Sequence, residues 1–505
     1  MGKTFTAILL VFSMLCLVGC NGKKEKSSIE SYDSIEPAAL KPMDLNIYTY
    51  GGAVTSTGKD TIEAMLAQLQ PATADTINVT PHFFWLPAER YESEIKRLVE
   101  SEEKIDAFTC YSPEPFVEQG LCKDLSELFK QYAPAYYQEL ASSSIGKEYL
   151  TGASSNGKLY AIPYYALKSP RYCIVTRAEL ADKYAPEGIE TLEEYGEFLR
   201  RVGENESYTY PGFVRSSQFF RSYMMGNGYY SDLDEYLFFR WDEKGKNPYT
   251  SERTPEFLNA YELLKDWKVK EYVVPNNAKQ KYFDPSDGSL ASYLVPMQES
   301  DQIFSIIPGS QVQLKMLPLY RKSPHLLNTS PWGTAIAENC RNPERVLMFI
   351  EWIHSNQKNY DHFTYGVEGE NYILQGENLT FPRGEVQPLY TWKYYGAVFY
   401  QDFRYERIIQ NVYPEFKQVY QNSTLENIKA SGDLREQRKE ALKGLTQEYE
   451  QIRGYVTAYY QNMEYFFQSI DSGAFRISPE ELKEKQKAAG IDKVLDLCRK
   501  YIPDS

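Results

Sequence analysis

Aromatic side chains are the residues of this sequence best suited to recognition chemistry. The chain contains 43 tyrosines, 25 phenylalanines and 6 tryptophans, so 15% of its residues are aromatic. Most such rings pack in cores and between lobes, but a ring that lines a wet groove stacks on the apolar face of a sugar. Trp85 and Trp332 are the strongest candidates for this second role, and Trp241 is a weaker one.

Sequence patterns for catalysis are weaker than this pattern for recognition. Carboxylates are common, but the sequence does not place two of them across a cleft, as the hydrolysis of glycosides requires. Tyr111 and Ser112 are followed by Glu114, yet no histidine stands where it would activate a hydroxyl, so we interpret them as loop residues after a strand. The chain lacks CxxC, HExxH, P-loop, GxGxxG and GxSxG patterns. A sugar-active enzyme stays open but unsupported, and no catalytic residues are expected.

The net charge and the small number of metal-ligating side chains limit the partners and cofactors that the chain can bind. The formal net charge of −14 argues against nucleic acid, which needs a basic surface, and against binding to anionic lipid by charge alone. Only 4 histidines and 7 cysteines are present, and the pair His354 and His362 lacks recognisable further ligands. We therefore expect no metal, no cofactor and no nucleic acid.

Residues 1–20 have the pattern of an export signal. Lys3 supplies a positive start, and the apolar run that follows to Val18 is too short to span a membrane stably. The run ends in the letters LVGC, which look like a bacterial lipobox and imply cleavage before Cys20 and lipidation of its thiol; an ordinary secretory signal is the alternative. Residues 21–43 are rich in Lys, Glu and Ser and are predicted to form a flexible tether. The protein would then be held at the membrane by lipid without spanning it.

The remaining cysteines do not suggest a disulfide framework. Once the signal and Cys20 are set aside, an odd number is left at irregular spacing. The pairing of Cys110 with Cys122 is the one that stays open.

Length and element pattern predict an α/β protein with more than one lobe. A chain of 505 residues is too long for one hydrophobic core. Strands are expected at 45–50, 76–84 and 105–110, and helices at 59–69 and 87–100. Strands that alternate with helices of this length form a parallel sheet. Ligands bind beyond the carboxyl ends of such strands, which places Trp85, Tyr111 and Ser112 at one rim.

The stretch from Pro331 to Leu374 carries the most information. A short strand at 334–337 leads into a helix with Asn342 as N-cap, and the proline after it suits the first helical position. The helix presents one apolar face, made of Val346, Leu347, Ile350 and Ile353. An aromatic loop with two glycines follows at 365–369, and Tyr372 lies just beyond it.

In this order, these features resemble the family 1 extracellular solute-binding proteins of ABC importers. The strand, the Asn-Pro-Glu turn at 342–344 and the amphipathic helix recur in that family. The loop Tyr365-Gly-Val-Glu-Gly369 with Tyr372 is similar to the YG.eG..Y loop of its LipO-like lipoprotein cluster. Further segments similar to the family lie at 120–128, 156–163, 312–319 and 488–494.

The resemblance implies a type II-like periplasmic-binding-protein fold. Each of its two lobes is a mostly parallel sheet flanked by helices, with a helical C-terminal region. The predicted boundaries are 44–163 plus 319–362 for lobe 1 and 164–318 plus 363–505 for lobe 2, which includes the C-terminal helices. A third crossing near 360–365 would complete a three-segment hinge. Helices in lobe 2 are expected at 192–202, capped by Thr191, and at 255–267, capped by Thr254.

The resemblance also suggests site residues. The segment that ends at Pro163 marks a crossing between lobes in the family, which places Tyr164 at or near the hinge. Tyr365 and Tyr372 enter as ligand-binding residues. Glu368 would accept hydrogen bonds from sugar hydroxyls, or would simply cap a turn.

These inferences predict a monomeric, lipid-anchored extracytoplasmic protein of the bacterial cell membrane. It would capture a solute by hinge closure and deliver it to the permease subunits of an ABC importer. A carbohydrate, and among carbohydrates an oligosaccharide, is the preferred ligand because of the aromatic content and the resemblance. A sensor subunit of the same fold, a binder of peptides or other solutes, and a sugar-active enzyme remain alternatives.

Overall fold

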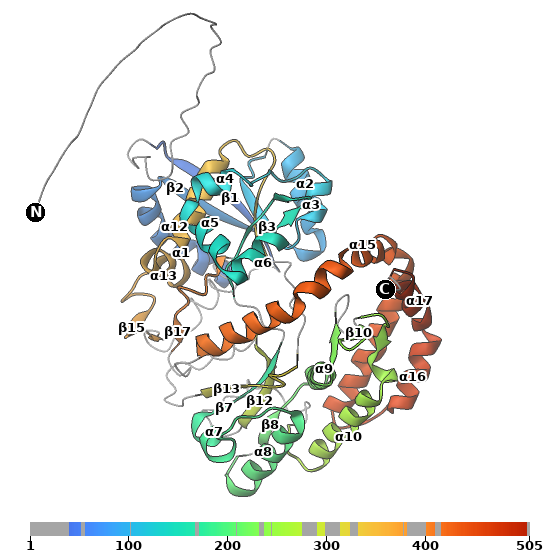
Figure 1. Cartoon of the computed structure of the whole chain (residues 1–505). Helices are drawn as coiled ribbons and strands as arrows, with labels where there is room; N and C mark the ends of the chain where they lie inside the picture. The colour runs from blue at the N-terminus through green and yellow to red at the C-terminus, as the bar shows by residue number, and fades with distance from the viewer. Residues whose placement is uncertain are drawn as a thin grey trace, which may run out of the picture.

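The computed structural model describes residues 40–51, 56–101, 103–166, 171–208, 210–231, 237–243, 245–274, 290–297, 314–323, 332–376, 378–380, 400–409 and 416–501. The predicted signal peptide, Cys20 and most of the tether at 21–43 lie outside these residues. Within the described ranges, no helix combines the length and the apolar character needed to cross a bilayer. The chain forms two lobes, one above the other in Figure 1, and a long C-terminal helix passes between them.

The first lobe is built on a five-stranded sheet with the strand order β2-β1-β3-β14-β6. Its strands are β1 (Met43–Tyr50), β2 (Val79–Leu86), β3 (Ala107–Cys110), β6 (Ile162–Pro163) and β14 (Gly333–Ile336). Strand β1 is parallel to β2 and β3, whereas β14 is antiparallel to both of its neighbours, β3 and β6. All strands except β14 therefore point in one direction.

Helices flank this sheet (Figure 1). They are α1 (Ser56–Thr76), α2 (Tyr91–Glu100), α3 (Glu114–Glu118), α4 (Leu128–Tyr132), α5 (Pro134–Ser142), α6 (Ser144–Gly152), α12 (Pro343–His354) and α13 (Gln357–Tyr365), with a 3-10 turn η3 (Ala88–Arg90) and a hairpin of β4 (Ser154–Ser155) and β5 (Lys158–Leu159). The strand–helix alternation predicted for the first part of the chain is confirmed. Helix α1 continues through Pro71 and is longer than expected.

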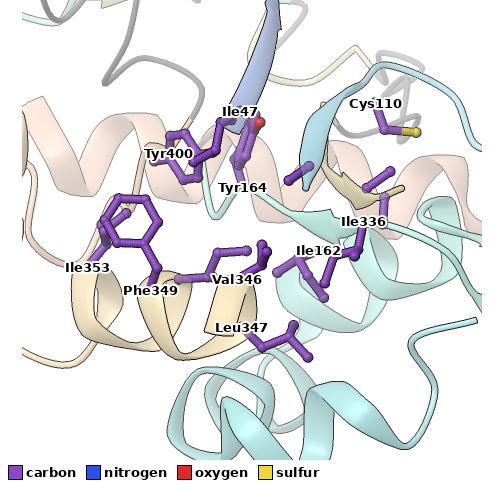
Figure 2. Packing of buried hydrophobic residues seen from close by; sticks show 14 of the residues in the cluster. Ile47, Cys110, Ile162, Tyr164, Ile336, Val346, Leu347, Phe349, Ile353 and Tyr400 are labelled. Carbon is purple, nitrogen blue, oxygen red and sulfur yellow. The ribbon is translucent and has the colours of Figure 1, made fainter. Parts of the chain in front are cut away.

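Helix α12 is buried on every side rather than on one face. All its residues from Arg345 to His354 are buried, and in Figure 2 Val346 points toward Ile162 of the sheet whereas Leu347 points to the opposite side of the helix. Its polar residues have partners, since Glu351 accepts hydrogen bonds from the backbone N–H groups of Ala135 (3.1 Å) and Tyr136 (3.0 Å). Asn342 stands at the N-cap position, but its side chain makes no capping hydrogen bond, so that part of the prediction is wrong.

The second lobe contains a four-stranded sheet with the order β13-β7-β12-β8. Its strands are β7 (Tyr172–Arg177), β8 (Tyr210–Phe213), β12 (Leu290–Pro296) and β13 (Leu314–Pro318). Around it lie α7 (Ala178–Tyr184), α8 (Leu192–Asn205), α9 (Ser216–Gly226), α10 (Pro255–Val269), a 3-10 turn η4 (Ser251–Arg253) and a small sheet of β9 (Tyr229–Ser231), β10 (Leu237–Arg240) and β11 (Tyr249–Thr250). The predicted caps are confirmed, because Thr191 and Thr254 each accept a backbone hydrogen bond at the start of their helices.

Each main sheet contains a single reversed strand among those described. In the second lobe this strand is β7, which is antiparallel to β12 and β13, while β12 and β8 are parallel. Both β14 and β7 are the first strand of their sheet after the chain has passed from the other lobe. The prediction of mostly parallel lobes therefore holds for strand direction, although the paired strands are mixed parallel and antiparallel.

The C-terminal helices pack on the second lobe, as predicted. They are α15 (Phe416–Asp471), α16 (Pro479–Ala488) and α17 (Ile491–Tyr501). The ring of Phe466 on α15 lies 5.9 Å from Phe220 and 5.5 Å from Phe257, all within the second core. Helix α15 starts between the lobes and then turns along the second lobe (Figure 1).

The third crossing between lobes lies later than the sequence suggested. The chain after residue 362 was expected in the second lobe, but Phe363, Tyr365, Tyr372 and Tyr400 belong to the core of the first. A small sheet of β15 (Ile373–Gln375), β16 (Asn378–Thr380) and β17 (Ile408–Ile409) follows α13. Conversely, Leu319 packs in the second core rather than in the first. The described chain thus stays with the first lobe as far as Tyr405, and α15 packs in the second core from Ile452 onwards.

Candidate ligand-binding site

The candidate site lies at the rim where the first sheet ends. Strand β1 ends at Tyr50, Trp85 is next to last in β2, and Tyr111 follows the end of β3. Because β14 runs in the opposite direction, its beginning lies at the same rim, which brings Trp332 there. The carboxyl ends of parallel strands are the usual ligand-binding edge of an open α/β sheet.

Three rings pack together at this rim, and we call Tyr50, Tyr111 and Trp332 the aromatic platform. The ring of Tyr50 lies 5.7 Å from Tyr111 and 5.3 Å from Trp332, and Tyr111 lies 6.3 Å from Trp332. Each ring is only partly buried, so each keeps surface exposed to solvent. Trp85 lies at the same rim but on the other face of the sheet, because it pairs with Thr49 and lies near Gly51, where a built Cβ would be 3.5 Å from its Cδ1. The structure thus brings together two predicted residues, Tyr111 and Trp332, and adds Tyr50.

A buried tyrosine supports the platform from below. The ring of Tyr91 lies 5.1 Å from Tyr50 and 6.4 Å from Tyr111. Its hydroxyl lies 2.7 Å from the carbonyl oxygen of Thr109 and 3.2 Å from that of Tyr48. Burial raises the pKa of Tyr91 well above its ordinary value, so the hydroxyl stays protonated and remains a donor.

The positions of Tyr111 and Trp332 are fixed by neighbours. Tyr111 donates its hydroxyl to the carboxylate of Glu92, and burial followed by this carboxylate raises the pKa of Tyr111. The carbonyl oxygen of Trp332 accepts a hydrogen bond from the N–H of Tyr164 at 3.0 Å. The next residue, Gly333, must lack a side chain, because a Cβ there would lie 2.5 Å from the carbonyl oxygen of Ile162.

Three of the predicted tyrosines are buried, which corrects their assignment to the ligand surface. Tyr164 lies in the first core, with its hydroxyl 3.2 Å from Thr334 Oγ1 and its ring against Tyr400, as Figure 2 shows. Tyr365 is 1% exposed and accepts a hydrogen bond from the N–H of Arg407. Tyr372 is 4% exposed and packs on Tyr365. Burial in the core, together with hydrogen-bonded hydroxyls in Tyr164 and Tyr365, identifies packing residues.

The other predicted residues lie outside the platform. Glu368 is exposed in the turn closed by the backbone pairing of Gly369 with Tyr372. Ser112 is partly exposed and donates its hydroxyl to Glu114 at 2.7 Å, a local contact after β3. Trp241 is in the second lobe, where it packs on Tyr230 with ring centroids 4.6 Å apart.

A buried polar cluster ties the segment before the third crossing to the first lobe. Asp402 is fully buried, 3.0 Å from His354 Nδ1 and 2.6 Å from Arg404 Nη2, and these two residues hold the pKa of Asp402 below its ordinary value despite its burial. The ring of His354 stacks on Tyr136 at 3.9 Å. The N–H of Phe403 donates to the carbonyl oxygen of Tyr165, so this segment lies beside the first crossing. We call Asp402, His354 and Arg404 the hinge cluster.

A second contact ties the crossings to α15. Arg171, just before β7, is 1% exposed, and its Nη1 donates to the carbonyl oxygens of Leu319 and Tyr320 on the return crossing. Its Nε donates to Ser423 Oγ on α15 at 3.1 Å. One side chain therefore links two crossings and the long helix.

Metal chemistry and disulfide formation receive no support in the described residues. No group of three or more His, Cys, Asp and Glu side chains there is arranged to hold a metal ion. Cys110 and Cys122 are both buried and are free thiols, so the pairing left open by the sequence is not made.

The sequence was compared with protein families and with curated proteins. No protein-family model matches the sequence. Over 268 residues, about half the length of each chain, it is 22% identical to a carbohydrate ABC transporter substrate-binding protein of Streptococcus pneumoniae. The chain thus spans about half the length of this curated relative.

Solved structures agree on the fold. The N-glycan transport solute-binding protein NgtS of Streptococcus pneumoniae superposes with a TM-score of 0.62 at 17% identity, covering 92% of this chain and 98% of that one. The alginate-binding protein AlgQ2 superposes with a TM-score of 0.52 at 14% identity, with coverages of 92% and 98%. A family 1 extracellular solute-binding protein of Alicyclobacillus acidocaldarius reaches 0.50 at 13% identity, with coverages of 91% and 100%. The resemblance to family 1 solute-binding proteins and the two-lobed fold that it implies are confirmed.

Proposed function

We propose that this protein captures a carbohydrate outside the cell and delivers it to an ABC importer without altering it. The observation that carries the proposal is the aromatic platform at the ligand-binding rim of a two-lobed fold. Exposed faces of Tyr50, Tyr111 and Trp332 suit the apolar face of a sugar ring, while tyrosine hydroxyls suit its polar edge. The relatives support this ligand class, since NgtS has been crystallised with Man1GlcNAc and with Man5GlcNAc.

The proposed mechanism is closure of the two lobes over a ligand held on the platform. The first crossing is paired at Tyr165 with Phe403 of the segment that precedes the third crossing, and Arg171 couples the first crossing to the second. Few residues then need to change backbone conformation for one lobe to rotate on the other. The ligand stabilises the closed form by its contacts with both lobes, and the closed form docks on the permease.

The anchor and location follow from the sequence prediction. Lipidation of Cys20 would hold the protein at the outer face of the cell membrane, and the tether would let the lobes reach the permease. We propose a monomer, because one chain carries both lobes.

The test is a binding screen of the mature protein without its lipid. Neutral and acidic mono- and oligosaccharides are compared with amino acids and short peptides by thermal shift, where ligand at a hundred times its Kd stabilises the fold by about 2.7 kcal/mol. Calorimetry then measures affinity, and chromatography checks that the ligand is recovered intact. Hits only among peptides would refute the carbohydrate claim, and a cleaved ligand would identify an enzyme.

Substitutions in the aromatic platform test whether the ligand binds there. Trp332→Ala and Tyr50→Ala are each expected to weaken carbohydrate binding about tenfold, because a lost stacking contact is worth roughly 1 kcal/mol or more. Tyr465→Ala is the matched control, since Tyr465 is an exposed aromatic on α15, 46% accessible and outside the platform. Loss of affinity in the control but not in the platform variants would exclude the site.

A further inference from the structure

A pocket continues the aromatic platform on the side of helix α2. It lies between the turn η3 with the start of α2, from Ala88 to Lys96, and the residues Tyr111 and Gln119 that follow β3. Tyr111 forms part of both features, since its ring packs on Tyr50 and Trp332 and also lines the pocket. A chain-like ligand stacked on the platform at Tyr111 would therefore reach the pocket with its next unit.

The polar groups of this pocket balance in charge. Glu89 and Glu92 supply acceptors, Arg90 and Lys96 supply donors, and Ser93 and Gln119 add uncharged groups of both kinds. Two carboxylates opposite two cations leave the lining without net charge. Such a lining suits hydroxyl groups, which donate and accept at once, better than it suits an anion.

The carboxylate of Glu92 is oriented for a ligand. The hydroxyl of Tyr111 donates to its Oε1, which holds the side chain of Glu92 against the platform. A carboxylate has acceptor sites for several further donors. Hydrogen bonds to a charged acceptor are the stronger ones, so a sugar hydroxyl in this position would be bound tightly. The pocket volume of about 480 Å³ is within the range of small-molecule sites.

From this geometry we infer that the pocket is a subsite for one neutral sugar unit of an oligosaccharide whose next two units lie on the three rings of the platform. The inference rests on the proposed function and narrows it: the ligand is a neutral oligosaccharide longer than a disaccharide, and Glu92 is a specificity-determining residue. The subsite is supported by the cavity and the balanced charges of its lining; the start of α2 contributes only some of the lining residues.

The test compares short and long members of neutral oligosaccharide series by calorimetry. Maltose with maltohexaose, cellobiose with cellohexaose, and Man1GlcNAc with Man5GlcNAc are the probes, and oligogalacturonate is the acidic comparison. The native protein is expected to bind the long member of one series about tenfold more tightly than the short one. Ser93→Trp fills the pocket from an exposed helix position and should abolish this difference while leaving the short ligand bound.

A matched pair of variants tests the role of Glu92. Glu92→Gln should reduce the preference for the long ligand, because the charged acceptor is lost while the shape is kept. Glu94→Gln is the control, since Glu94 lies on the same helix outside the pocket and pairs with Arg97. Equal affinity of the native protein for short and long members, or an undiminished preference in Ser93→Trp, would overturn the inference.

The outcomes separate the inference from the proposed function. Binding of oligogalacturonate alone would overturn the neutral ligand but keep carbohydrate capture. Binding of a disaccharide with no gain from longer members would overturn the subsite and likewise keep capture. Failure of every carbohydrate to bind, with the protein folded by circular dichroism, would overturn both.

Discussion

Replacement of Asp402 by Asn should be among the most damaging changes of a single atom in the first lobe. The carboxylate is fully buried and lies 3.0 Å from His354 Nδ1, 2.6 Å from Arg404 Nη2 and 3.1 Å from the backbone N–H of Arg404, which donates to it. The variant keeps the shape but leaves the guanidinium without its buried counter-charge. Loss of one partner of a buried ion pair costs about 3–5 kcal/mol. We expect the lower value, about 3 kcal/mol, because Arg404 also lies 3.3 Å from Glu139.

Differential scanning calorimetry measures this effect. A loss of about 3 kcal/mol lowers the unfolding midpoint of a lobe of this size by roughly 6–12 °C. Asp492→Asn is the control: Asp492 pairs with Arg253 at 2.6 Å on the surface, where it is 52% exposed and worth less than about 1 kcal/mol. The double variant Asp402→Asn with Arg404→Met should recover much of the stability, because no buried charge is then left alone. If Asp402→Asn costs no more than Asp492→Asn, the hinge cluster does not stabilise the fold.

Three further predictions concern other links between sequence and fold. Burial lowers the pKa of His354 below its ordinary value of 6.5, so its contribution to stability is complete above that pH and is lost as the pH falls; His354→Gln should flatten the decline in urea stability below about pH 6.5. Gly333→Ala should lower the stability of the fold by about 1–3 kcal/mol, because the added Cβ would clash with backbone atoms. Gly454→Ala should raise it by about 0.5–1 kcal/mol, because the Cβ in helix α15 would have open space around it. An unchanged melting midpoint in both variants would contradict this description of the packing. Ser478→Ala should cost about 1 kcal/mol in chemical denaturation, since it removes one half of the capping box with Glu481; a neutral result would mean that α16 starts without it.

Local signals predicted much of the fold. Strand β1 alternates buried and partly exposed residues, and Thr191 and Thr254 cap the helices that follow them, so periodicity and cap chemistry were sufficient there. The third crossing was misplaced because the contacts that hold it are distant in sequence. His354 and Asp402 are 48 residues apart, and Asp361 and Arg407 are 46 apart.

The candidate site was predicted only where strand ends marked it. Trp85, Tyr111 and Trp332 follow from the position of strands in the sheet, and Tyr50 was missed although it is the last residue of β1. Tyr164, Tyr365 and Tyr372 went wrong for a different reason. Each is buried in the core. The hydroxyl of Tyr164 is hydrogen-bonded to Thr334 there, and the hydroxyl of Tyr365 accepts a hydrogen bond from the N–H of Arg407. A tyrosine in sequence does not indicate which of these two environments it occupies.

The platform and the hinge share backbone, which bears on how ligand binding would be coupled to closure. Trp332 directly precedes β14, the reversed strand that begins when the chain returns to the first lobe, and its carbonyl oxygen accepts from the N–H of Tyr164 on the first crossing. A rotation of the second lobe would therefore act on both segments at once. A sugar stacked on Trp332 would favour the backbone geometry in which these crossings are held together, so the ligand biases the equilibrium between open and closed lobes through the residues that connect them. If Trp332→Phe kept affinity but lost the compaction that ligand induces in small-angle X-ray scattering, this coupling would be separable from stacking itself.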